Sequence, residues 1–169
     1  MSATLLVAVG DALVCLKLVG RANFTTSADF KPLVNSLREQ GRSRFVLDLS
    51  ECVGLDSTFL GMLSAFAQQL AESAKGAGQI DLLNANPRVV ESLDNLGVLQ
   101  RFVLATGAFA FNGRYEMVPP GTFTKAELAG HSIEAHRFLM QVHPENVRKF
   151  QDVVRMLEDE VSKAVTTPS

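Results

Sequence analysis

The chain has 169 residues, of which 47% are hydrophobic and 20% are charged, and its formal net charge is −2. These values are typical of one globular domain with an extension, or of one large domain. The small negative charge argues against direct binding of nucleic acid or of an anionic membrane, because such proteins usually carry a surplus of basic residues. No apolar run approaches the roughly 18 residues that span a bilayer, so membrane insertion is not expected.

The first elements in chain order are two strands and a helix. Residues 5–9 and 12–19 are rich in strand-forming residues and are separated by the turn signal Gly10-Asp11. A loop over residues 20–27 and a helix over about 28–40 are expected to follow, with Ser27 as the helix N-cap. The short turn predicts that the two strands pair as an antiparallel hairpin.

A strand, a loop and a helix follow in residues 45–73. The strand begins at Phe45, Gly54 lies in the loop, and Asp56-Ser57-Thr58 suit a helix N-cap before a helix from Phe59. This order places the Ser57 hydroxyl on the first turn of a helix. Free backbone N–H groups and the positive end of the helix dipole favour negative charge there, so the position suits a phosphate.

The remaining elements complete an alternating order. A strand is predicted over residues 79–84, a helix from Asn86-Pro87 to Gly97, and short edge strands over 102–105 and 109–111. The order β-β-α-β-α-β-α-β predicts an α/β domain over residues 1–111, with a mixed, mostly parallel sheet and helices packed on it.

Residues 112–169 are predicted to form a C-terminal helical extension. A polar loop over 112–121 precedes two helices, about 124–142 and 145–164, which are separated by His143-Pro144. Both helices carry an apolar stripe that must pack on something. Two interpretations stay open: a helical hairpin packed on the main domain, or an arm for homodimerisation or partner docking.

The helix from Phe59 has more apolar surface than a helix lying on a sheet usually needs. One stripe is formed by Leu60, Leu63, Ala67 and Leu70, and a second by Phe59, Met62 and Phe66. The second stripe is either covered by the C-terminal helices or exposed as a binding surface.

The sequence gives no sign of a catalytic, metal or cofactor site. Cys15 and Cys52 lack metal-type spacing and are expected to be reduced thiols of a cytoplasmic protein. We interpret His131, His136 and His143 as surface or packing residues. Because no nucleophile–base pair or nucleotide fingerprint is recognisable, we expect neither an enzyme nor a bound cofactor.

Three segments, together with the order of elements, carry a resemblance to a known family. Leu47-Asp-Leu-Ser, the following Leu55-Asp-Ser-Thr-Phe-Leu-Gly61 and residues 82–98 resemble a STAS domain of the bacterial anti-sigma factor antagonist type, over about residues 4–110. The resemblance implies that Ser57 is phosphorylated by an anti-sigma factor that is itself a serine kinase. It also implies that the unphosphorylated chain binds this anti-sigma factor and frees the sigma factor, and that a phosphatase resets the system.

The resemblance also gives an expected partner-binding surface. It consists of Asn23, Asp56, Ser57, Thr58, Phe59 and Met62. Two of these positions depart from the family's usual residues, since Phe59 stands in place of a common glycine and Asn23 in place of an aspartate.

Two other functions stay open at this point. In the first, the chain is a STAS scaffold that is not phosphorylated, or a regulatory subunit of a transporter or stress-signalling assembly, and Ser57 is a structural contact. In the second, the chain is a small α/β enzyme or ligand-binding domain with an unrecognised pocket.

Overall fold

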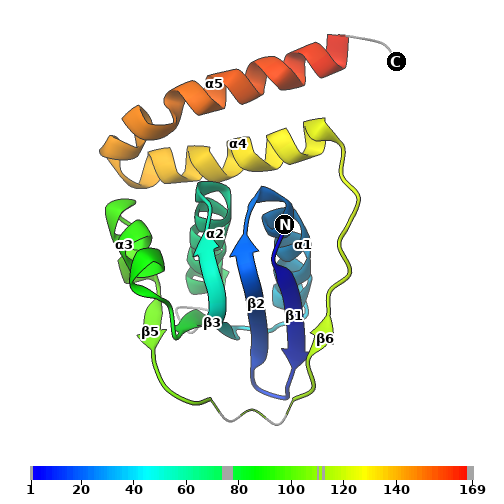
Figure 1. Cartoon of the computed structure of the whole chain (residues 1–169), viewed down its shortest axis with the longest axis vertical. Helices are drawn as coiled ribbons and strands as arrows, with labels where there is room; N and C mark the ends of the chain where they lie inside the picture. Colours follow the sequence, from blue (N-terminus) through cyan, green and yellow to red (C-terminus); the bar gives the residue numbers. More distant parts are fainter. Residues whose placement is uncertain (1, 74–77, 110, 112, 167–169) are drawn as a thin grey trace.

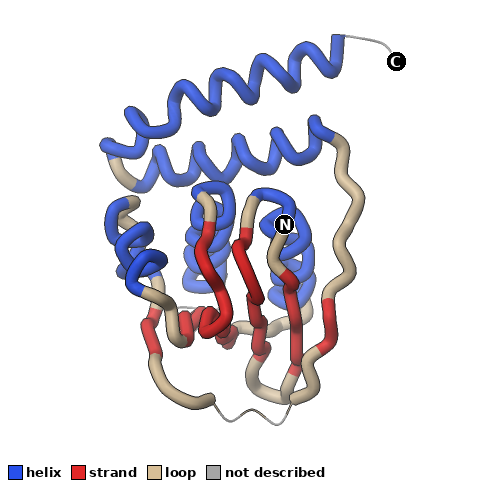
Figure 2. Tube along the Cα trace, in the orientation of Figure 1, coloured by secondary structure: helices blue, strands red, loops and turns tan. Residues whose placement is uncertain are grey.

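The structure is a computed structural model that describes residues 2–73, 78–109, 111 and 113–166. One mixed sheet and five α-helices make up the described residues (Figures 1 and 2). The strands are β1 (Thr4–Val9), β2 (Val14–Ala22), β3 (Arg44–Leu55), β4 (Gln79–Leu83), β5 (Val103–Ala105) and β6 (Glu116–Met117). The helices are α1 (Phe24–Glu39), α2 (Ser57–Ser73), α3 (Pro87–Asn95), α4 (Lys125–Val142) and α5 (Pro144–Thr166), with a 3-10 turn, η1, at Leu99–Arg101.

The strands form one sheet in the order β5-β4-β3-β2-β1-β6. Strands β2, β3, β4 and β5 are parallel, and β1 pairs antiparallel with both β2 and β6. The mixed, mostly parallel α/β sheet predicted from the order of elements is therefore confirmed. Parallel strands place their C-terminal ends at one edge, and α1 and α2 begin at that edge (Figure 1).

Helices α1 and α2 pack on one face of the sheet and enclose the main core. Leu16 and Leu47 from the central strands are fully buried, as is Phe30 of α1. Phe45 of β3 meets Phe66 of α2 edge to face, with ring centroids 5.1 Å apart. Leu16 and Leu18 of β2 and Leu47 of β3 point into this core, whereas Cys15 and Val46, one position before Leu16 and Leu47, belong to a second small apolar cluster.

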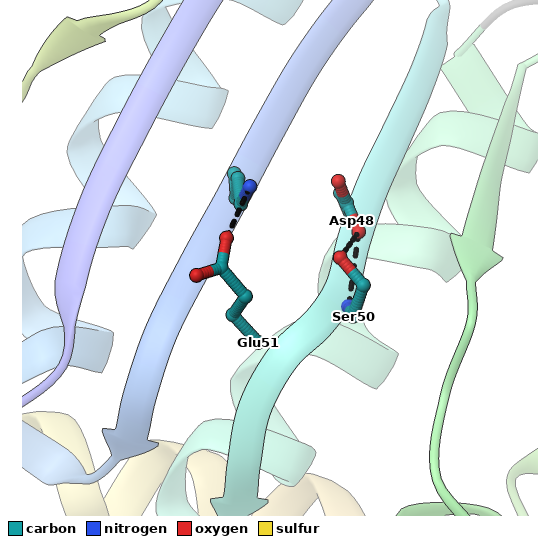
Figure 3. A network of polar contacts seen from close by, with 4 residues as sticks. Asp48, Ser50 and Glu51 are labelled. Carbon is teal, nitrogen blue, oxygen red and sulfur yellow. Dashed lines mark hydrogen bonds and ion pairs between the residues drawn. The ribbon is translucent and has the colours of Figure 1, made fainter. Parts of the chain in front are cut away.

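The other face of the sheet is partly polar. Lys17 of β2 forms an ion pair with Glu51 of β3, and Asp48 accepts hydrogen bonds from the amide and the hydroxyl of Ser50 (Figure 3). The register of β2 against β3 shifts between Lys17 and Val19, which is typical of a β-bulge. The ion pair joins two paired strands and the Asp48–Ser50 bonds lie within β3, so these contacts are structural features of the sheet.

Helices α4 and α5 form an antiparallel pair, which we call the helical hairpin (residues 125–166). Figure 1 shows α4 lying across the edge where β2 and β3 end and α1 and α2 begin, with α5 stacked on its outer side. Leu139 of α4 is fully buried against the main core. The interpretation of the extension as a hairpin packed on the main domain is therefore confirmed, whereas homodimerisation stays a prediction.

Several predicted boundaries were wrong. Strand β2 continues through Ala22 and α1 begins at Phe24, so the segment expected to be a loop over 20–27 is strand and helix. The N-cap is Asn23 and not Ser27, because the Asn23 side chain accepts hydrogen bonds from two amides of the first turn and forms a capping box with Thr26. The described part of 109–111 is not strand, and the short strand β6 lies within the expected polar loop.

None of the described helices is both long enough and apolar enough to cross a membrane.

Candidate functional site

Ser57 lies at the junction of β3 and α2, as predicted from the sequence. Strand β3 ends at Leu55, and the Asp56 amide donates a hydrogen bond to the carbonyl of Ala22 at the end of β2. The Asp56 carboxylate then accepts a 2.8 Å hydrogen bond from the Phe59 amide, which caps α2. Ser57 is the first residue of the helix and is half-buried.

Burial raises the pKa of the Asp56 carboxyl. Other groups act in the opposite direction: the amides of Phe59, Phe24 and Thr58 stabilise the carboxylate, and so does the nearby His136. The amide of Phe24 belongs to the first residue of α1, so one carboxylate is shared by the N-termini of two adjacent helices. The site therefore lies where two helix N-termini meet.

The Ser57 hydroxyl contacts a residue of the helical hairpin. Its Oγ lies 2.8 Å from Nε2 of His136 on α4. Nδ1 of His136 lies 2.8 Å from the carbonyl oxygen of Ser132, which can only accept, so Nδ1 carries the ring proton. Burial lowers the pKa of His136, more than the Ser132 carbonyl and Asp56 raise it. The neutral ring thus presents a lone pair at Nε2, and Ser57 is the donor.

Two further hydroxyl contacts join α4 to the helix N-termini. Thr58 Oγ1 lies 2.8 Å from Ser132 Oγ, and both side chains are buried. Ser27 on α1 lies 2.6 Å from Nε2 of His131. Burial lowers the pKa of His131, and the charge of Lys31 lowers it further, while Glu134 opposes both. His131 therefore joins α4 to α1, and His136 joins α4 to α2.

Gly61 of α2 permits the close approach of α4. A Cβ atom at this position would lie 2.4 Å from the carbonyl oxygen of Ala135, which is backbone and cannot rotate away. A glycine inside a helix costs about 0.5–1 kcal/mol relative to alanine. Here the glycine is needed because α4 lies so close to it. Its φ angle is one that other residues also adopt.

The residues predicted to bind a partner are unequally accessible. Asn23, Asp56 and Ser57 keep some solvent exposure, with Asn23 capping α1. Thr58 is 4% exposed and Met62 5% exposed. Phe59 is fully buried and packs edge to face on Phe30, with ring centroids 5.1 Å apart. Phe66 packs on Phe45 of β3, so α1 and the sheet cover much of the second apolar stripe. Met62 lines a groove to which α4 also contributes, so the hairpin covers this stripe only in part.

Sequence reasoning missed two contributors to the site. His136 is 3% exposed and bonded to Ser57, so its interpretation as a surface residue is wrong and the packing alternative is correct. Ser132, which contacts Thr58, is the second contributor. The two lie one helical turn apart on α4, a spacing that puts both on one face, but nothing in the sequence indicates which element that face meets.

The fold and the local sequence at Ser57 agree with a known family. Residues 5–110 match the STAS domain family, and the chain belongs to it. No match was found among curated proteins.

Three solved structures show the same fold. TM1081 of Thermotoga maritima is 23% identical with a TM-score of 0.53, over 61% of this chain and 86% of that one. An anti-sigma factor antagonist from Mycobacterium paratuberculosis is 22% identical with a TM-score of 0.53, over 62% and 86%. The Bacillus cell fate determinant SpoIIAA in its phosphorylated form is 19% identical with a TM-score of 0.51, over 61% and 91%. At these identities the likeness establishes the fold.

Proposed function

We propose that this protein is a phosphorylation-controlled binding switch of the anti-sigma factor antagonist type, with Ser57 as the modified residue. The observation that carries the proposal is the position of Ser57 at the start of α2, directly after the Asp56 cap and beside the start of α1. Membership of the STAS family and the fold shared with an anti-sigma factor antagonist support it.

The proposed partner is an anti-sigma factor that is also a serine kinase. It transfers the terminal phosphoryl group of a nucleoside triphosphate to the Ser57 oxygen. The new P–O bond forms as the bond to the leaving nucleoside diphosphate breaks, and the hydroxyl proton passes to a base. A phosphatase reverses the modification by hydrolysis. The unphosphorylated chain binds the anti-sigma factor, and its proposed contact surface is Asn23, Asp56, Ser57, Thr58, Phe59 and Met62.

The phosphate acts mainly on the partner in this proposal. A phosphoserine carries a charge of about −1.5 to −2, and a helix N-terminus tolerates or mildly stabilises that charge. Bulk, desolvation and repulsion from acidic groups of the partner, reinforced by Asp56, then weaken the complex. A loss of only about 1.4 kcal/mol corresponds to a tenfold loss of affinity.

The direct test is incubation with purified serine-kinase anti-sigma factors and ATP, followed by mass spectrometry of the peptide that carries Ser57. We expect one added phosphate on this peptide and none in Ser57→Ala. Modification of Thr58 in place of Ser57, or no modification by any candidate kinase, would contradict the proposal.

A second function is favoured by one observation, the hydrogen bond from Ser57 to His136. If Ser57 serves only to hold α4, the chain is a STAS scaffold or a regulatory subunit of a transporter or stress-signalling assembly. In that case Ser57→Ala weakens α4 docking. Partner binding by the wild type is then the same before and after treatment with a kinase.

A further inference from the structure

The helical hairpin covers the surface on which the proposed switch depends. Its α4 helix contacts the first turn of α2 through His136 and Ser132, and the first turn of α1 through His131. The carbonyl of Ala135 lies over Gly61 one turn further along α2. A partner that binds the Ser57 surface therefore meets α4 first.

The STAS fold is complete without the hairpin. The family match ends at residue 110, before α4 begins at Lys125. The solved structures that share the fold are matched over 86% or more of their own length, so they have little room for a counterpart of two long helices. Removing α4 from the surface would therefore leave a fold that other proteins adopt by themselves.

The connection to the hairpin suits movement as a unit. Residues 119–122 are exposed, and Gly121 is held by one amide hydrogen bond to Asp29. Within the hairpin, Arg137 pairs with Glu158, and the His136 ring contacts Phe150 at 4.8 Å between ring centroids. These contacts belong to the hairpin itself and can persist when it moves.

A second attachment holds the far end of the hairpin. Asn146, at the start of α5, is fully buried and donates hydrogen bonds to the carbonyls of Leu96 and Leu139. His143 packs against Gly97 just after α3. The hairpin therefore has a hydroxyl–imidazole contact at the helix N-termini, a separate anchor near α3, and an apolar contact in which Leu139 is buried in the main core. The first contact exchanges readily for water, because hydroxyl and imidazole groups hydrogen-bond well to solvent.

We infer that the helical hairpin is an autoinhibitory cover, which docks on the Ser57 surface and opens without unfolding of the STAS domain, so that a partner and α4 compete for one face. This inference rests on the proposed function in assigning the partner to that face. Its structural content does not depend on any kinase. A cover that is closed most of the time reduces the apparent affinity of a partner by the fraction of open molecules.

The hydrogen bond between Ser57 and His136 links the position of the hairpin to phosphorylation of Ser57. In the closed state the Ser57 hydroxyl donates to the lone pair of His136 Nε2. A phosphate at Ser57 removes that proton and turns acceptor oxygens toward the lone pair. While His136 is neutral, phosphorylation therefore shifts the hairpin toward its open position, and the shift is largest at high pH because a protonated His136 pairs with the phosphate. The opened face then carries the phosphate itself, which repels the partner of the unphosphorylated chain.

Cysteine accessibility tests the inference in the full chain. In Ser57→Cys, the introduced thiol reports on the cover, while native Cys15 and Cys52, both free and buried in the domain, report on global unfolding. Each thiol is followed by N-ethylmaleimide modification and peptide mass spectrometry. We expect the thiol at position 57 to react at least about tenfold faster than Cys15 and Cys52, and faster again when Gly61→Val is added.

Two further variants keep the test decisive. His131→Ala removes one docking contact without new bulk, and faster reaction of the thiol at position 57 is expected here too. Gly130→Ala on α4 has open space around its Cβ and should not accelerate any of the three thiols. Equal rates for the introduced thiol in every variant would overturn the cover. A thiol at position 57 that reacts no faster than Cys15 and Cys52 would overturn it as well, because the hairpin would then open only when the whole domain unfolds. Failure of Ser57 phosphorylation by kinases would instead overturn the proposed function and leave these rates as predicted.

Discussion

Ser57 and His136 lie 79 positions apart in the chain and 2.8 Å apart in the structure, and the serine is the donor. The direction follows from the carbonyl of Ser132, which fixes the ring proton on Nδ1. The Ser57 hydroxyl therefore donates a hydrogen bond to α4, and phosphorylation would remove the proton of that bond.

Replacing His136 should weaken docking of the hairpin. We expect His136→Ala to lower the free energy of unfolding by about 1–3 kcal/mol, because buried groups lose their hydrogen-bond partner and Phe150 loses a ring contact. Chemical denaturation followed by circular dichroism gives the value. Gln141→Ala, on an exposed position of the same helix, is the matched control and should change little. Equal effects of the two substitutions would show that the Ser57 contact contributes nothing.

The two glycines of the interface helices should respond in opposite directions to alanine. Gly61→Ala places a methyl group against the Ala135 carbonyl, and overpacking of this kind costs about 1–3 kcal/mol. Gly130→Ala meets nothing and should stabilise α4 by about 0.5–1 kcal/mol through helix propensity. Thermal denaturation of both variants checks the sign. A stabilising Gly61→Ala would mean that α4 does not approach α2 as closely as the structure shows.

Stability should fall as the solution is acidified below neutral pH. The pKa values of His131 and His136 are lowered from an ordinary value of 6.5, so the unfolded chain binds more protons than the folded one below that pH. The contribution of the two neutral histidines to the free energy of unfolding is complete above pH 6.5. It is lost as the pH falls through their lower pKa values in the folded chain. Asp56 has the opposite effect on stability, in a more acidic range. Its pKa is raised, so its contribution to the free energy of unfolding is present at low pH and is lost as the pH rises.

Denaturant midpoints measured between about pH 5.5 and 8 test this dependence. The double variant His131→Ala/His136→Ala should show a flatter pH profile over this range than the wild type. Lys31 and Glu134 also face His131. Salt screens these two charges, so profiles measured at two salt concentrations separate their effect on the His131 pKa from the effect of burial. An unchanged profile in the double variant would exclude the two histidines as the cause.

A negative charge at position 57 should open the hairpin at high pH. In Ser57→Glu the carboxylate faces the lone pair of neutral His136, whereas Ser57→Gln has nearly the same size without the charge. We expect faster amide hydrogen exchange in α4 and in the first turn of α2 for the Glu variant at about pH 8. At about pH 6 the difference should shrink, because a protonated His136 pairs with the carboxylate. Identical exchange in the Glu and Gln variants at the higher pH would show that charge does not matter here.

Much of the fold follows from local signals. The short turn between β1 and β2 and the alternation of strands and helices indicated the mixed sheet, and Asp56 directly before Ser57 indicated where α2 starts. The N-terminus of α1 was misplaced because the strand-forming pattern of β2 is interrupted by Gly20, although Asn23 is itself a good cap.

The site was predicted only in part. Ser57 could be found because a strand, a cap and a helix surround it in sequence. His136 could not, because its role depends on how the hairpin docks, and residues of an amphipathic helix do not indicate which surface they meet. A glycine inside a helix permits another element to approach closely, but only the position of Ala135 shows which element approaches Gly61.

The central claim is that the state of Ser57 controls binding of another protein at a face that α4 also occupies. The most direct measurement is calorimetric titration of one purified serine-kinase anti-sigma factor into the unphosphorylated chain, the Ser57-phosphorylated chain and His131→Ala. We predict binding that weakens at least about tenfold on phosphorylation and that tightens in His131→Ala, where more molecules are open. Equal affinity for the phosphorylated and unphosphorylated chains would contradict the account.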